Sequence, residues 1–142
     1  MLGCGLRRAE VCDLKLKQVS IKNKSAKIIG KGNKERTIYF PTAVLEVLKN
    51  WLDARSLNKE EIDAGFVFGR IDNRQRLHLD IPLDPSSITR IVEKLVSETD
   101  NLEGRLTPHD LRRTFATRLI SKNVDIVEVQ KLMGHASVAT TG

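Results

Sequence analysis

Two side chains in the last third of the chain could bind a phosphate together. His109 and Arg112 lie three residues apart, so a helix would present them on one face. Thr107 followed by Pro108, with the acid Asp110 three residues after Thr107, comes close to a capping box and is typical of a helix N-terminus, which places His109 in the first turn. Free backbone N–H groups and the helix dipole favour an anion at that place.

The same pair has a simpler interpretation, which the sequence leaves open. The buried stripe of this helix is expected to consist of Leu111, Phe115, Ala116 and Leu119. His109 and Arg112 would then face away from the core. At such a position an ion pair with Asp110 is commoner than a ligand site.

Three further residues could join an anion site, and each also has an ordinary explanation. Lys31 lies between two glycines and could be an exposed turn lysine, and Arg7 could be a plain surface arginine. His135 follows Gly134, which suits the C′ position of a helix that ends at Met133. A histidine there is often only a partner of the helix dipole.

Regular segments must position these residues. Residues 26–29 and 36–40 are strand-like runs joined by a glycine-containing turn, so the sequence predicts a β-hairpin with Lys31 near its tip. A short helical pattern begins at Leu6, and a longer one covers residues 41–55.

The second half of the chain is predicted to be mainly helical. Residues 66–68 are expected to form a third strand. Helices are predicted to begin at Pro85, at Pro108 and after Asp125, where Glu128 would complete a second capping box. The apolar stripe of the first of these helices consists of Ile88, Ile91, Val92, Leu95 and Val96. The fold class is therefore a mainly α domain with a small antiparallel β-sheet (α+β).

Charge is unevenly distributed along the chain. The formal net charge is +6, from 24 basic and 18 acidic residues. Residues 7–36 alone hold 10 basic and 3 acidic side chains. A basic block on an otherwise balanced domain is the usual electrostatic footprint of a polyanion ligand, although a solvated lysine-rich surface has the same composition.

Composition excludes several classes of protein. A chain of 142 residues that is 40% apolar suits one domain with a packed core. No apolar run approaches the length of a membrane helix and no signal peptide is visible, so we expect a soluble, cytoplasmic protein. Cys4 and Cys12 lack the spacing of a disulfide framework. A metal site built from Cys4, Cys12, His109 and His135 is only a remote alternative, because short paired ligand spacings are absent.

Four segments occur in an order that resembles a known family. They are GLRRAE at residues 5–10, GKGNKER at residues 30–36, TPHDLRRTFAT at residues 107–117 and LMGH at residues 132–135. Each is modest alone, but together they resemble the tyrosine recombinases (phage integrases), which are site-specific DNA recombinases. The resemblance runs from Gly3 to Thr141, although residues 58–81 carry no motif.

The resemblance implies a role for each motif. The catalytic residues that it implies are Arg7, Lys31, His109, Arg112 and His135. Glu10 would support Arg7. In the family, a tyrosine attacks the scissile phosphate and leaves a 3′-phosphotyrosine and a free 5′-hydroxyl, a reaction that needs no cofactor and no metal.

These side chains suit that reaction. Two guanidinium groups, Arg7 and Arg112, can clamp the extra negative charge of the pentavalent phosphate by bidentate hydrogen bonds. Lys31 on its hairpin can protonate the 5′-oxygen as it leaves. His109 would accept the proton of the nucleophile or hydrogen-bond the phosphate, and His135 would donate to a phosphate oxygen.

The partner implied by the resemblance is double-stranded DNA. The family forms homo-oligomers on DNA, so the full-length protein is expected to be a tetramer there. Residues expected to contact DNA are Arg8, Lys34, Arg36 and Arg113. A cytoplasmic, nucleoid-associated protein of bacterial or phage origin would fit.

The sequence departs from the family pattern at the nucleophile. In the family the nucleophilic tyrosine follows the last histidine by several residues, which here falls beyond Gly142, and the single tyrosine, Tyr39, matches no nucleophile position. Residues 1–142 are therefore expected to be a partial catalytic domain, without the core-binding domain and the tyrosine segment, and to be inactive alone. The alternative is a non-catalytic DNA-binding module that keeps the phosphate-binding cluster.

Overall fold

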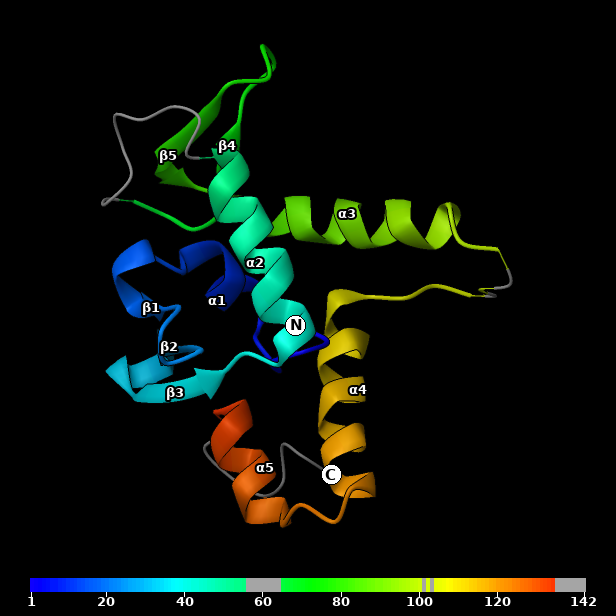
Figure 1. The fold of residues 1–142 in the computed structure, drawn as a ribbon. Helices are drawn as coiled ribbons and strands as arrows, with labels where there is room; N and C mark the ends of the chain where they lie inside the picture. The colour runs from blue at the N-terminus through cyan, green and yellow to red at the C-terminus, as the bar shows by residue number, and fades with distance from the viewer. Residues whose placement is uncertain (56–64, 101, 103, 135–142) are drawn as a thin grey trace. The chain divides into compact units, whose positions relative to one another are not determined.

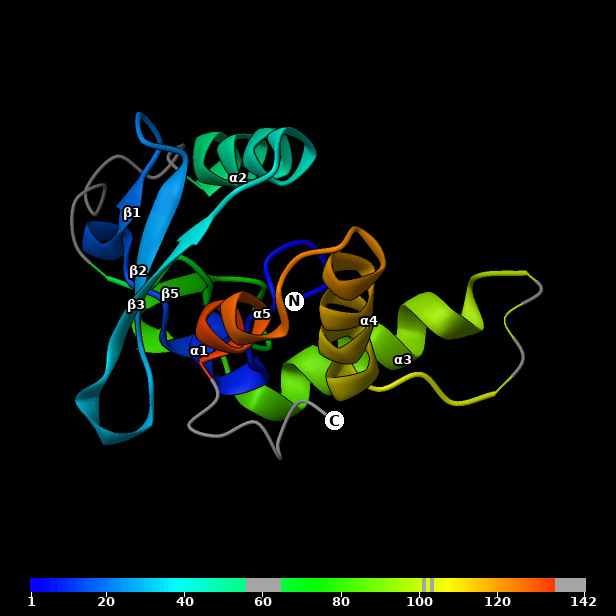
Figure 2. The same ribbon diagram turned by 90° about the horizontal axis from the view of Figure 1, so that it is seen from below.

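A sheet unit, Glu10–Leu83, and a helical unit, Met1–Ala9 with Asp84–Gly142, make up the fold. The computed structural model describes residues 1–55, 65–100, 102 and 104–134. Figures 1 and 2 show the helices and strands from two directions. The predicted fold class is confirmed, because helices dominate and the strands pair in small antiparallel sheets.

A three-stranded antiparallel sheet forms much of the sheet unit. Its strand order is β1 (Val19–Ser20), β2 (Ser25–Ile29) and β3 (Glu35–Tyr39). Side chains alternate between the two faces of a strand, and Ala26, Ile28 and Ile38 are buried on one of them. The predicted hairpin is therefore confirmed, with Ala26 opposite Ile38 and Ile29 opposite Glu35.

The tip of this hairpin is one short 3-10 turn, η2 (Lys31–Asn33). Gly32 and Asn33 have positive φ angles of 74° and 57°, a region that glycine and asparagine adopt more readily than other residues. A Cβ atom on Gly32 would meet no other atom within 4 Å. Lys31 is exposed on this open turn.

Two helical segments flank the sheet in the sequence. They are α1 (Arg8–Asp13), which is followed by the 3-10 turn η1 (Leu16–Gln18), and α2 (Thr42–Arg55). The predicted helix over residues 41–55 is thus confirmed. Leu45 and Leu48 of α2 are buried, and its last turns carry Trp51 and Arg55, which donate hydrogen bonds to the backbone carbonyl of Val67.

The prediction of a strand over residues 66–68 is wrong. The N–H groups of Phe66 and Val67 donate to the carbonyls of Leu79 and Leu14, and their own carbonyls accept from side chains of α2. Apart from an isolated antiparallel bridge between Phe66 and Lys15, this segment therefore satisfies its backbone outside a ladder. The antiparallel hairpin here consists instead of β4 (Gly69–Ile71) and β5 (Leu77–Pro82).

Three helices, α3 (Pro85–Ser97), α4 (Pro108–Ser121) and α5 (Ile126–Met133), form the helical unit. The predicted capping box at the start of α4 is confirmed, with Thr107 and Asp110 bonding each other's backbone N–H groups. The second predicted box, at α5, is wrong. Asp125 instead accepts from the N–H of Val127 alone, because it caps the second amide of the helix.

The core of the helical unit lies between α4 and α5, which run side by side in Figures 1 and 2. Its buried members are Ala116, Val129 and Met133, and the partly buried Phe115, Leu119 and Val124 pack against them. In the apolar stripe of α3, Val92 is buried while Ile91 and Leu95 are at least half exposed. None of the helices in the described part of the chain has the length and apolar character that a membrane crossing needs.

Candidate functional site

A cavity of about 580 Å³ in the helical unit brings together four of the basic residues that the sequence singled out. Its basic lining residues are Arg7, Arg8, Arg105, His109 and Arg112. No acidic residue is among the described residues that line it. We call it the four-arginine cavity. Positive charge concentrated in a concave site attracts anions, so the geometry suits a phosphate group.

Arg112 is buried, and the prediction that it faces away from the core is wrong. Only 4% of the residue is exposed. Its Nη1 donates to the carbonyl oxygen of Gly5 at 2.6 Å, and its Nη2 donates to the carbonyl oxygen of Met133. A guanidinium can be buried only with such partners, and these come from segments far away in the sequence.

Arg7 and Arg112 meet at the end of α5. Arg7 Nη2 donates to the carbonyl oxygen of Gly134 at 3.0 Å, next to the carbonyl of Met133 that Arg112 holds. The last carbonyls of a helix lack partners within the helix and carry partial negative charge. Hydrogen bonds thus connect three of the four sequence motifs at one place. The last motif residue, His135, lies outside the described residues.

Gly5 makes this close approach possible. Its φ angle is 66°, and a Cβ atom there would lie 2.5 Å from Cδ1 of Phe115 and 3.0 Å from Sδ of Met133. Both the backbone conformation and the contact therefore require a glycine.

Replacing Gly5 with alanine is expected to lower the free energy of unfolding by about 3 kcal/mol, since left-handed strain and a steric clash add together. A thermal melt measures the loss. Gly32→Ala is the control, because its φ angle of 74° is similar but its surroundings are open. That variant should lose only about 1 kcal/mol. Equal losses in both variants would contradict a close packing role for Gly5.

His109 lies in the first turn of α4, lines the cavity and is exposed. Its neighbour Asp110 is committed to the helix cap. Hydrogen bonds from the hydroxyl and the backbone N–H of Thr107 hold the pKa of the Asp110 carboxyl below its usual range, and the positive charges of Arg113 and His109 add to this. The ion pair between Arg112 and Asp110 that the sequence suggested is thus replaced by a cap and by carbonyl contacts.

Lys31 and Lys34 lie in the sheet unit, where both are exposed on the β2–β3 hairpin. Glu10 accepts hydrogen bonds from both Nη atoms of Arg36, at 2.7 and 2.8 Å. The two side chains are 7% and 12% exposed, so this bidentate ion pair ties α1 to β3. Support of Arg7 by Glu10 and DNA contact by Arg36 stay predictions.

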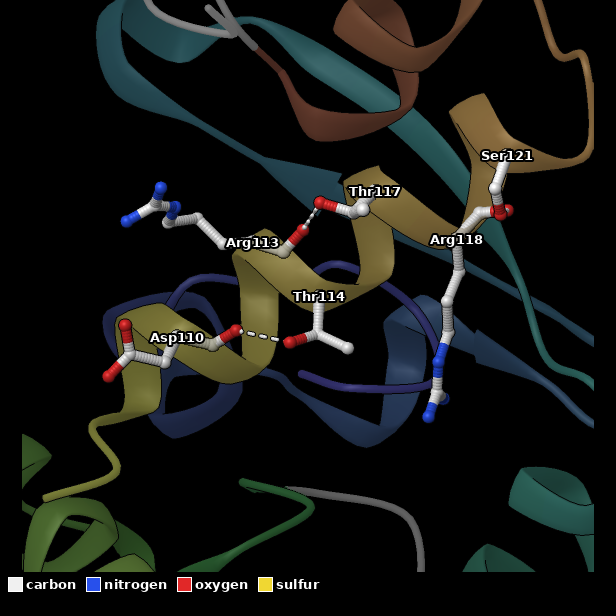
Figure 3. A pocket seen from close by; sticks show the side chains of 6 residues that line it. All are labelled: Asp110, Arg113, Thr114, Thr117, Arg118 and Ser121. Carbon is white, nitrogen blue, oxygen red and sulfur yellow. Dashed lines mark hydrogen bonds between the residues drawn. The ribbon is translucent and has the colours of Figure 1, made fainter. Parts of the chain in front are cut away.

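Arg113 lines a different hollow, of about 330 Å³, along the outer side of α4 (Figure 3). The hydroxyls of Thr114 and Thr117 donate to backbone carbonyls one turn earlier, at Asp110 and Arg113. Figure 3 shows the side chains of Arg113 and Arg118 extending away from one another. This hollow therefore gathers less positive charge than the four-arginine cavity.

Two lining residues had no signal in the sequence. Thr89 of α3 accepts a hydrogen bond from Arg8 Nη1 at 2.8 Å, and Arg105 precedes the cap of α4. Neither belongs to a motif. Arg8 and Thr89 are far apart in the chain, so local spacing of residues cannot predict their contact.

The structure describes only part of the alternative metal site. Cys4 and Cys12 are buried thiols, and burial raises the pKa of Cys4. Across the described residues, no three His, Cys, Asp or Glu side chains gather closely enough to hold a metal ion. His135 lies outside those residues.

Comparison with known proteins gives consistent relatives. A model of the phage integrase family matches residues 1–142. Tyrosine recombinase XerC of Corynebacterium glutamicum is 36% identical over 137 residues, which cover 96% of this chain and 41% of that protein. The chain therefore spans less than half the length of this relative.

Two solved structures are similar in fold. The crystal structure of XerA recombinase has a TM-score of 0.82 and 32% identity, covering 99% of this chain and 48% of that one. A post-cleavage complex of XerH site-specific recombinase, bound to a palindromic difH substrate, has a TM-score of 0.77 and 29% identity. It is matched over 99% of this chain and 38% of that one.

Proposed function

We propose a function from one premise: this chain belongs to the phage integrase family. Residues 1–142 are part of the catalytic domain of a tyrosine recombinase that breaks and rejoins DNA strands through a 3′-phosphotyrosine. The observation that carries the proposal is the four-arginine cavity, which brings together Arg7, His109 and Arg112 from segments near opposite ends of the chain. The similarity to tyrosine recombinase XerC, and to XerH site-specific recombinase in complex with its difH substrate, supports a role in DNA recombination.

The cavity residues act on the phosphate. When a tyrosine oxygen attacks the phosphorus atom, the non-bridging oxygens gain negative charge, and Arg7 and Arg112 stabilise it. Because both guanidinium groups are already held by carbonyls of the protein, they need little reorganisation as that charge develops. His109, in the first turn of α4, accepts the proton of the nucleophile or donates to the phosphate.

Lys31 and His135 complete the proposed reaction. As the bond from phosphorus to the 5′-oxygen breaks, Lys31 gives its proton to that oxygen and leaves a 5′-hydroxyl. The exposed, glycine-flanked turn that carries Lys31 suits a group that must reach a substrate. His135, directly after the Gly134 carbonyl held by Arg7, donates to a phosphate oxygen. Attack by a 5′-hydroxyl on the phosphotyrosine reverses the steps and needs no cofactor.

Double-stranded DNA is the proposed partner, and a homotetramer on DNA is the proposed assembly of the full-length protein. Arg8, Lys34 and Arg113 are proposed to contact the DNA backbone, and all three are exposed. Sedimentation of the full-length protein with a recombination site tests the assembly, since a complex with four protein chains is expected. A complex that stays at one chain per site would contradict it.

DNA affinity of residues 1–142 is expected to fall steeply with salt and to depend little on base sequence. If four phosphates are neutralised, affinity should drop roughly 100-fold between 50 and 200 mM salt, because counterions are released on binding. Fluorescence anisotropy of a labelled duplex measures this, with a duplex of scrambled sequence as the control. Affinity that does not change with salt would contradict the proposed phosphate contacts.

A further inference from the structure

We infer that the four-arginine cavity holds two consecutive phosphates of one DNA strand, and that Arg8, Thr89 and Arg105 form the subsite for the second. The inference rests on the proposed function, in which the first phosphate is the scissile one. It assigns a substrate contact to two residues, Thr89 and Arg105, that belong to no motif of the chain.

The four-arginine cavity is larger than a single phosphate needs. The cavity has a volume of about 580 Å³, which lies in the range of pockets that hold a ligand of nucleotide size. A single phosphate would occupy only a small part of that space. The cavity therefore has room for a nucleoside and the phosphate on its other side.

The basic residues of the cavity are anchored on two different helices. Arg7 and Arg112 donate to the carbonyls of Gly134 and Met133 at the end of α5. Arg8 instead donates to Thr89 of α3, at 2.8 Å.

Arg105 shares that second anchor. Its Nη2 lies 3.6 Å from Oε1 of Glu93. Glu93 is four residues after Thr89 and is therefore on the same face of α3. The cavity thus has one arginine pair fixed on α5 and a second pair on α3. Two separate pairs fit two phosphates better than one.

The pair on α3 can exchange its present contacts for a phosphate. The side chains of Arg105 and Glu93 are 79% and 47% exposed, so water weakens their ion pair. The nearby carboxylate of Asp84 is engaged as the cap of α3. Hydrogen bonds from Ser86 are the chief cause of the lowered pKa of Asp84, and nearby arginines, including Arg8, contribute less.

The hydroxyl of Thr89 completes the subsite. Its oxygen accepts from Arg8, and a hydroxyl also carries one hydrogen that it can donate to a phosphate oxygen. Two guanidinium groups and one donor hydroxyl give the second phosphate a set of charged and neutral hydrogen bonds.

Thymidine 3′-monophosphate and thymidine 3′,5′-bisphosphate test the inference, because only the second carries two phosphates with the spacing of a DNA strand. Each is titrated into residues 1–142 and followed by NMR. The bisphosphate is expected to bind at least about tenfold tighter. Arg105→Ala and Thr89→Val should each remove most of that difference and change monophosphate affinity little. Arg118→Ala, which removes the same charge outside the cavity, should leave both affinities unchanged.

Other results separate the two claims. Equal affinity for the two ligands, or a preference that survives Arg105→Ala and Thr89→Val, would overturn the second subsite. The proposed function would still stand in that case if Arg7→Ala abolished binding of the monophosphate. If neither ligand bound, or if binding ignored Arg7→Ala, both the subsite and the proposed function would fail. Circular dichroism confirms that each variant is folded.

Discussion

Replacing Arg112 with methionine is expected to destabilise the helical unit by about 4 kcal/mol and to abolish phosphate binding in the same variant. The substitution leaves the carbonyls of Gly5 and Met133 without their guanidinium donor, and an unsatisfied buried polar group costs about 1–3 kcal/mol. It also removes one of the basic residues that line the four-arginine cavity. Chemical denaturation and a phosphate titration measure the two effects.

Matched variants separate the buried role of Arg112 from its charge. Arg113→Ala removes the same charge at the next position, which is exposed, and should change stability by no more than about 0.5 kcal/mol. Arg112→Lys keeps the charge, but a single ammonium lacks the fork that spans two carbonyls, so only part of the stability should return. If Arg112→Met were as mild as Arg113→Ala, the buried anchoring of Arg112 would be refuted.

Residues 1–142 alone are expected to form no covalent adduct with DNA. An arginine clamp and a general acid stabilise a transition state that still requires an attacking oxygen, and serine or threonine hydroxyls are weaker acids than a phenol. The single tyrosine, Tyr39, is on β3 of the sheet unit and 66% exposed. Incubation with a nicked duplex, followed by denaturing electrophoresis, detects any adduct.

A complete tyrosine recombinase such as XerC, on its own recombination site, is the positive control for that experiment. Adduct formed by residues 1–142 would contradict the prediction. The same assay with Tyr39→Phe would then show whether Tyr39 is the nucleophile. If no adduct forms, phosphate binding still distinguishes two possibilities. Binding that depends on Arg7 indicates a specific phosphate site in the cavity, whereas binding that does not depend on Arg7 indicates a surface that holds DNA only through scattered charges.

Local signals predicted most of the elements around the cavity. The Thr107–Pro108 start of α4 and the glycine after Met133 rest on backbone geometry within a few residues, and both predictions were correct. The β2–β3 hairpin followed from alternation and from a glycine turn in the same way. Such features can be predicted because their causes lie within one stretch of sequence.

Contacts between distant segments could not be predicted in this way. Helical periodicity counts apolar side chains, so it placed Arg112 outside, whereas two carbonyls from remote segments allow its burial. The strand prediction for residues 66–68 fails for a similar reason. Trp51 and Arg55 donate to carbonyls of this segment, and nothing in the sequence of the segment itself indicates those donors. The positions of Thr89 and Arg105 in the cavity could not be predicted for the same reason.

A titration of residues 1–142 with a short DNA duplex, followed by NMR of the arginine and histidine side chains, tests the central claim most directly. We predict that the Nε–H signals of Arg7 and Arg112 and the imidazole signals of His109 shift together with one dissociation constant. The signal of Arg118, outside the cavity, should stay in place. DNA that bound tightly while the signals of Arg7, His109 and Arg112 did not move would contradict the four-arginine cavity as the phosphate site.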